Sequence, residues 1–146
     1  FKNLTVKENL EISGMFMGKE EFEKEINTIF ELFPKLKKIY NRNAGFLSGG
    51  EKHQLALSMV FLKKPELVLL DEPSAGLAPS LIKDMISAIK NLKEINFSTI
   101  LLVEQNVSEG LKISDFVYSM KTGMIISPPI PSKNFDISYI EELFLK

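Results

Sequence analysis

Two short segments of the sequence carry the residue types most able to do chemistry. Residues 47–51 read Leu-Ser-Gly-Gly-Glu, which predicts a loop that enters a helix. The backbone N–H groups of a helix start attract anions, and adjacent glycines let a phosphate approach the backbone closely. Residues 67–73 read Leu-Val-Leu-Leu-Asp-Glu-Pro, an apolar strand that delivers two adjacent carboxylates at its end. Because successive side chains of a strand point in different directions, one acid can hold Mg²⁺ while the other deprotonates an attacking water.

Both segments also have purely structural explanations. Ser48 and Glu51 have the spacing of a capping box, which starts many helices that bind nothing. An acid at a strand end can serve solubility alone, but two acids behind four aliphatic residues match the place where open α/β sheets bind ligands. The one histidine of the sequence, His53, falls in the second turn of the predicted helix, and we assign it no catalytic role.

The composition is that of an ordinary globular protein. The chain has 146 residues, 45% hydrophobic and 25% charged, which is enough for one domain with a core. The formal net charge of −1 gives no reason to expect nucleic acid as a partner, and the lack of cysteine excludes disulfides and thiolate metal sites. Apolar runs such as Ile100–Val103 are far shorter than a bilayer span. Because the chain opens at Phe1 rather than Met, inside a running segment, we expect a piece of a longer protein.

Hydrophobic periodicity predicts the helices that position these segments. A helical pattern runs from about Leu4 to Tyr40, with a capping box at Thr5 and Glu8, a break from Gly14 to Gly18 and an end at Pro34. Further helices are predicted over 51–62, 80–92, about 107–113 and, at the C-terminus, 139–145.

Apolar runs predict the strands between these helices. Residues 67–70 and 99–103 have the composition of parallel strands covered on both faces. Residues 116–118 predict another strand, 121–123 a hairpin turn, and the proline-rich residues 127–132 a linker. The alternation of strands and helices indicates an α/β fold.

The two segments that could do chemistry resemble motifs of one family, the ATPase domains of ABC transporters. Residues 47–51 are similar to the ABC signature motif, and residues 67–72 to the Walker B strand with its catalytic glutamate. Residues 74–79 occupy the position of the D-loop, and residues 1–10 resemble the stretch after the Q-loop. The amino-acid sequences of residues 71–79 and of Leu102–Asn106 resemble those of the importer ATPases for branched-chain and related hydrophobic amino acids.

The resemblance implies an α/β fold in which a helical subdomain precedes the C-terminal half of a RecA-like P-loop NTPase layer. The implied boundaries are 1–46 for the helical subdomain, 47–126 for the signature loop and the RecA-like half with Walker B, and 127–146 for a linker and C-terminal helix. The implied function is ATP hydrolysis that drives uptake of branched-chain or other hydrophobic amino acids. Its implied setting is peripheral, on the cytoplasmic face of the plasma membrane, against membrane-spanning permease subunits.

The resemblance also implies roles for individual residues. In such proteins the signature loop of one subunit covers the ATP held by a second ATPase subunit, in a homo- or heterodimer. For the ATP bound to its own subunit, Asp71 is implied to hold Mg²⁺ and Glu72 to be the catalytic base. Gln105 stands where many members have a histidine that contacts the γ-phosphate, and is implied to be catalytic, although glutamine cannot shuttle a proton. The residues implied to bind the second subunit's nucleotide are Ser48, Gly49, Gly50 and Glu51.

Departures from the family pattern bear on activity. No glycine-rich loop ending in Lys-Ser or Lys-Thr occurs in the 146 residues, so we expect this chain alone not to hydrolyse ATP. Ala75 and Ala78 replace polar D-loop residues, and Met59 stands where an arginine is usual. Two alternatives stay open: a non-catalytic interaction module derived from an ABC ATPase, and an ABC ATPase outside transport, which the short helical segment disfavours.

Overall fold

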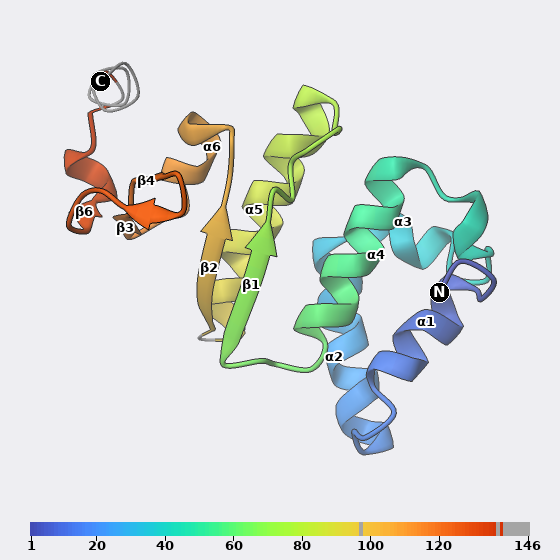
Figure 1. Cartoon of the computed structure of the whole chain (residues 1–146). Coiled ribbons are helices and arrows are strands. Elements are labelled where there is room, and N and C mark those ends of the chain that lie inside the picture. The colour runs from blue at the N-terminus through green and yellow to red at the C-terminus, as the bar shows by residue number, and fades with distance from the viewer. Residues whose placement is uncertain (97, 137, 139–146) are drawn as a thin grey trace. The chain divides into compact units, whose positions relative to one another are not determined.

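The computed structural model describes residues 1–96, 98–136 and 138, which form two compact units that divide between Val103 and Glu104. The first unit contains, in chain order, α1 (Val6–Ser13), α2 (Lys19–Leu32), α3 (Pro34–Lys38), η1 (Ala44–Phe46), α4 (Gly49–Phe61), β1 (Leu67–Asp71), α5 (Pro79–Asn96) and β2 (Thr99–Val103). The second contains α6 (Val107–Leu111), β3 (Phe116–Val117), β4 (Met120–Lys121), β5 (Met124–Ile125), β6 (Ile130–Pro131) and η2 (Ser132–Asn134). Figure 1 shows how the chain runs through these elements. The alternation of helices with parallel strands in the first unit confirms the α/β prediction.

The start of α1 is the capping box that the sequence predicts. The Thr5 hydroxyl accepts a hydrogen bond from the Glu8 backbone N–H at 3.1 Å, and the Glu8 carboxylate accepts one from the Thr5 backbone N–H at 2.7 Å. These reciprocal bonds satisfy donors that a helix start otherwise leaves unpaired. They hold the pKa of Glu8 below its ordinary value, first through the Thr5 backbone and then through its hydroxyl.

The break between α1 and α2 is also as predicted, whereas the role of Pro34 differs. A Cβ added at Gly14 would lie 2.3 Å from Phe22 Cδ2, so glycine lets the chain turn closely against α2. Pro34 follows the end of α2 at Leu32, but it also begins α3. At the first position of a helix the missing N–H of proline costs nothing. The lysine-rich residues 35–38 after Pro34 are therefore helical, and the Leu36 among them is buried.

The helices of the first unit pack around α4. Both α1 and α3 pack against α4, and α2 packs against α3 (Figure 1). An ion pair of 2.8 Å joins Lys64, just after α4, to the buried Glu25 of α2. The large side chains that this packing removes from water include Val6, Leu10, Ile29, Phe33, Leu36, Leu55, Phe61 and Leu62.

The two long strands form a parallel pair, as the sequence predicts. β1 and β2 are in register from Leu67 opposite Thr99 to Asp71 opposite Val103, and α5 joins them. Val68 is buried, and since α5 buries a row of apolar residues, we infer that α5 covers the face to which Val68 points. The prediction that both faces are covered is wrong for the residues described. One face leaves four apolar side chains more than half exposed: Leu67, Leu69, Leu101 and Val103.

The second unit consists of short elements. β4 and β5 form a hairpin whose turn residues, Thr122 and Gly123, have φ of 48° and 79°, as primed hairpin turns require. This confirms the predicted turn. The prediction of a linker over 127–132 is wrong in part, because Ile130 and Pro131 pair as β6 with β3. The helix predicted over 139–145 lies outside the described residues.

Candidate functional site

The loop before α4 has the geometry of a second capping box. The Ser48 hydroxyl accepts from the Glu51 backbone N–H at 3.3 Å, and the Glu51 carboxylate accepts from the Ser48 backbone N–H at 2.7 Å and from its hydroxyl at 2.9 Å. These bonds, the backbone bond most of all, hold the pKa of Glu51 below its ordinary value, and the positive charges of Arg42 and Lys35 act in the same direction. The spacing of Ser48 and Glu51 therefore does form a capping box, and Ser48 remains exposed at the helix start.

The two glycines of the loop have different structural reasons. A Cβ at Gly49 would meet nothing within 4 Å, so the backbone there is open to a ligand. A Cβ at Gly50 would lie 2.7 Å from Leu81 Cδ1, so the second glycine lets α4 approach the start of α5. The argument that glycines let an anion approach thus applies to Gly49, whereas Gly50 is explained by packing.

His53 contacts the same loop. Its Nδ1 lies 2.9 Å from the Gly49 carbonyl oxygen, so Nδ1 carries the proton when the two are hydrogen-bonded. The sequence interpretation gave His53 no role. The signal that could have found the contact is its i+4 spacing from Gly49, which places both residues on one face of α4.

The two adjacent carboxylates lie at the carboxyl end of the parallel strands. Asp71 is the last residue of β1, and Glu72 leaves the strand with φ of +45°, in the left-handed region. The Glu72 backbone N–H donates to the Val103 carbonyl at 2.9 Å, and its carbonyl accepts from the Ala75 N–H at 3.0 Å. Because a residue other than glycine rarely adopts this conformation, the surroundings of Glu72 must hold the turn in place.

The donor set fits a Mg²⁺ ion only in part. No group of three or more His, Cys, Asp or Glu side chains that could hold a metal occurs among the described residues. Mg²⁺ commonly takes only one or two protein carboxylates and completes its shell with water and substrate phosphates. An exposed carboxylate such as Asp71, at a strand end, is compatible with that mode of binding.

Gln105 lies in the second unit, next to Asn106 at the start of α6. Asn106 is the N-cap residue, as expected, but its side chain makes no capping bond. Its Oδ1 instead accepts from the Ser108 hydroxyl at 3.0 Å. The structure thus brings Ser48, Gly49 and the two carboxylates into one unit and assigns Gln105 to the other.

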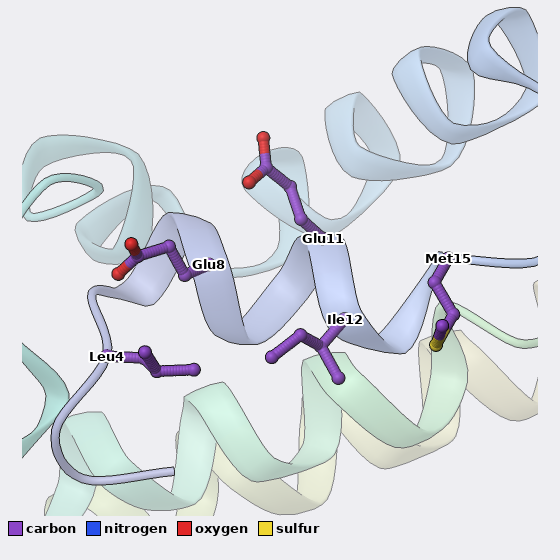
Figure 2. Close-up of a pocket in the computed structure, with 5 residues that line it drawn as sticks. All are labelled: Leu4, Glu8, Glu11, Ile12 and Met15. Atoms are coloured by element: carbon purple, nitrogen blue, oxygen red, sulfur yellow. The ribbon is translucent and has the colours of Figure 1, made fainter.

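A shallow cavity of about 390 Å³ lies along α1, and its lining includes none of the candidate site residues. Figure 2 shows that Leu4, Ile12 and Met15 lie on one side of α1, toward the neighbouring helix, while Glu8 and Glu11 point to the other. Met15 is 65% exposed and the adjacent Phe16 is 92% exposed. Nothing in the sequence predicts this exposed surface, because Ile12 fits the apolar pattern of a buried helix face.

Comparison with known proteins places these features in a family. The family model described as ABC transporter matches residues 1–75, slightly more than half of the chain. The branched-chain amino acid transport ATP-binding protein BraG of Pseudomonas aeruginosa is 42% identical over 126 residues, 86% of this chain and 54% of BraG. A probable branched-chain amino acid transport ATP-binding protein, LivF of Archaeoglobus fulgidus, is 41% identical over 125 residues, 86% of this chain and 53% of LivF. The chain therefore spans about half the length of the curated relatives it matches.

Solved structures agree with this comparison. An ATP-binding cassette of an ABC transporter in its ADP conformation matches 99% of this chain and 64% of its own, with a TM-score of 0.78 and 29% identity. A nucleotide-free cassette from an ABC transporter matches 99% of this chain and 60% of its own, with a TM-score of 0.75 and 27% identity. These matches confirm the RecA-like fold. Among the residues that the structure describes, no helix is both long and apolar enough to span a bilayer.

Proposed function

Since the chain belongs to the ABC transporter family, we propose that it is the signature-loop and Walker B part of an ATPase that drives amino-acid import. One observation carries the proposal: an open helix start at Ser48 and Gly49 occurs in the same unit as two carboxylates at the end of a parallel strand. The likeness to BraG and LivF, both described as branched-chain amino acid transport proteins, supports branched-chain or other hydrophobic amino acids as the cargo.

Each site residue receives a role under this proposal. Ser48 and Gly49 donate hydrogen bonds to the γ-phosphate of an ATP held by a second ATPase subunit, while Glu51 and Gly50 set the shape of that loop. Asp71 holds Mg²⁺, which supplies positive charge beside the phosphates when it is bound. Glu72 orients and deprotonates the attacking water, and Gln105 donates a hydrogen bond to the γ-phosphate.

The proposed setting is peripheral, at the cytoplasmic face of a membrane. The exposed apolar end of α1, formed by Ile12, Met15 and Phe16, is the surface that we assign to a permease subunit. The cavity beside it adds two acidic side chains, which favour a partner segment with basic residues. In this scheme 1–46 is the helical subdomain, 47–126 carries the catalytic motifs and 127–146 follows as linker and terminal segment.

The test joins this chain to the part of a relative that carries a phosphate loop. In the "extended chain", as we call it, the N-terminal part of BraG precedes Phe1. We expect Mg²⁺-dependent ATP hydrolysis that requires Glu72 and ATP-dependent dimerisation that requires Ser48. An extended chain that binds permease subunits but never hydrolyses ATP would favour the non-catalytic interaction module instead.

A further inference from the structure

The side chain of Asn43 bonds to two separate stretches of backbone just ahead of the Ser48 loop. Its Oδ1 accepts a hydrogen bond from the Gly45 N–H at 2.8 Å, and its Nδ2 donates one to the Asn3 carbonyl at 3.0 Å. The first bond closes the turn η1, of which Asn43 is the N-cap residue, and the second reaches forty residues back along the chain. Asparagine suits both partners because its amide carries an acceptor and a donor on one short side chain.

Backbone contacts join the same two segments. Thr5, the N-cap residue of α1, forms an antiparallel bridge with Asn43. A Cβ at Gly45 would lie 2.9 Å from the Lys2 carbonyl oxygen, so only glycine lets the two segments lie this close. The turn is therefore attached to the residues that lead into α1, and the Asn43 amide is the side-chain part of that attachment.

Little freedom remains between this turn and Ser48. The Ala44 N–H donates to the Leu4 carbonyl at 2.8 Å, and the Leu47 N–H donates to the Ala44 carbonyl at 3.3 Å. Ala44 and Leu47 are also buried, at 5% and 4% exposed. The direction in which the chain enters α4 at Ser48 is thus set by the turn that Asn43 holds.

We propose that Asn43 is a positioning residue for the nucleotide that Ser48 and Gly49 contact, an inference that rests on the function proposed above. A helix start binds a phosphate best when its donors already face that phosphate before binding. Because both polar atoms of the Asn43 amide bond to backbone, Asn43 acts through the Ser48 loop rather than on the phosphate. Without the amide the turn adopts further conformations, and the apparent affinity falls with the fraction of molecules that stay in the competent one.

This role predicts which binding event a variant weakens. Under the proposed function the Ser48 loop meets the ATP of the second subunit, whereas the phosphate loop of the extended chain binds that chain's own ATP. Asn43→Ala should therefore weaken the ATP-driven dimer and leave the binding of ATP to the monomer unchanged. A side chain that only stabilised the fold would lower the free energy of unfolding and leave the dimer's response to ATP as it was.

The experiment follows dimerisation of the extended chain by light scattering as Mg-ATP is raised, in a Glu72→Gln background that prevents turnover. Asn43→Ala should raise the half-saturating concentration by about threefold to tenfold, the size expected for the net loss of one or two hydrogen bonds. Gly45→Ala, which separates the same two segments in a different way, should have an effect of similar size. Asn27→Ala is the matched control and should change nothing, because the Asn27 Nδ2 donates to the Glu23 carbonyl within α2 at 2.8 Å.

A double-mutant cycle tests whether the attachment is the cause. If Asn43→Ala and Gly45→Ala both act by releasing the turn, their combination should be weaker than the worse single variant by no more than about twofold. Fully additive effects would mean that the amide acts by another route, and they would overturn the inference. An unchanged half-saturating concentration in Asn43→Ala, or an equal loss in the binding of ATP to the monomer, would overturn it as well.

These results are distinct from a failure of the proposed function. If Ser48→Arg abolishes dimerisation while Asn43→Ala has no effect, the proposed function stands and only the role of Asn43 is refuted. If no concentration of Mg-ATP drives dimerisation of the chain with an unmutated loop, the proposed function fails and the inference fails with it.

Discussion

The replacement of Glu72 by glutamine in the extended chain is the sharpest test of the catalytic assignment. Two backbone hydrogen bonds hold the turn at Glu72: its N–H donates to the Val103 carbonyl, and its carbonyl accepts from the Ala75 N–H. Glu72→Gln keeps these bonds, the side-chain length and the φ of +45°. We therefore expect the backbone turn to be retained and the carboxylate base to be lost.

The expected size of the kinetic effect follows from the role of a positioned base. Loss of a general base lowers turnover by roughly 10²–10⁴-fold. At about 1.4 kcal/mol for each tenfold change, the barrier rises by about 3–5 kcal/mol. ATP binding should survive, because the phosphate contacts come from other groups. The ATP-bound dimer should live longer, because the nucleotide that joins its subunits is no longer cleaved.

The assay combines phosphate release with the lifetime of the dimer. Glu72→Gly serves as a control for the backbone, because glycine adopts a positive φ without strain. The free energy of unfolding of this variant should be up to about 1 kcal/mol higher than that of the unmutated chain. Both variants should be inactive for the same chemical reason, although only Glu72→Gly changes the backbone strain. Unchanged turnover in Glu72→Gln would refute the Walker B assignment, and loss of nucleotide binding would make Glu72 a ligand-shell or structural residue.

Three further predictions concern the chain as it stands. Because the pKa of Glu51 in the folded protein is below its ordinary value of 4.5, its ionised carboxylate stabilises the fold at pH values above 4.5, and this stabilisation is lost as the pH falls through the lowered pKa. Urea unfolding at several pH values should show this loss in the unmutated chain and not in Glu51→Gln. Identical pH profiles for the two proteins would refute this prediction. Gly14→Ala should lower the free energy of unfolding by about 1–3 kcal/mol, because the added Cβ would lie 2.3 Å from the Phe22 ring. Gly49→Ala, whose Cβ would contact no atom within 4 Å, should change it by no more than about 0.5 kcal/mol in the same urea assay. Equal effects of the two substitutions would contradict the packing explanation. The exposed apolar face of β1 and β2 should make the chain self-associate or bind a hydrophobic dye, and Leu69→Lys should reduce both effects. A monodisperse monomer that unfolds cooperatively would contradict this prediction, because the core would then stabilise the fold without cover for that face.

Local signals in the sequence predicted most of the elements correctly. Both capping boxes, at Thr5 and Ser48, need only residues three apart, and so sequence alone finds them. The apolar runs that form β1 and β2 and the hairpin turn at Thr122 and Gly123 are equally local. The carboxylates at the end of β1 were predicted for the same reason, because a strand's end can be read directly from the pattern.

What could not be predicted depends on residues far apart in the chain. The pairing of β6 with β3 joins a proline-rich stretch to a strand more than ten residues earlier, and no local signal marks it. The exposure of Leu69 depends on what else covers the sheet rather than on the strand itself. The close approach of Gly50 to Leu81, thirty-one residues later, and the positive φ of Glu72 carry no sequence signature.

The capping box at Ser48 has a consequence for any anion that binds there. The Ser48 hydroxyl and backbone N–H both already donate to the Glu51 carboxylate. A phosphate that accepts a hydrogen bond from either Ser48 donor competes with the Glu51 carboxylate, which belongs to the same helix. Disruption of a cap costs about 1 kcal/mol, which corresponds to roughly a fivefold weaker apparent affinity. Glu51 thus acts as a built-in competitor that protects the helix start in the absence of nucleotide, and it sets the concentration at which the loop exchanges its own carboxylate for a bound phosphate.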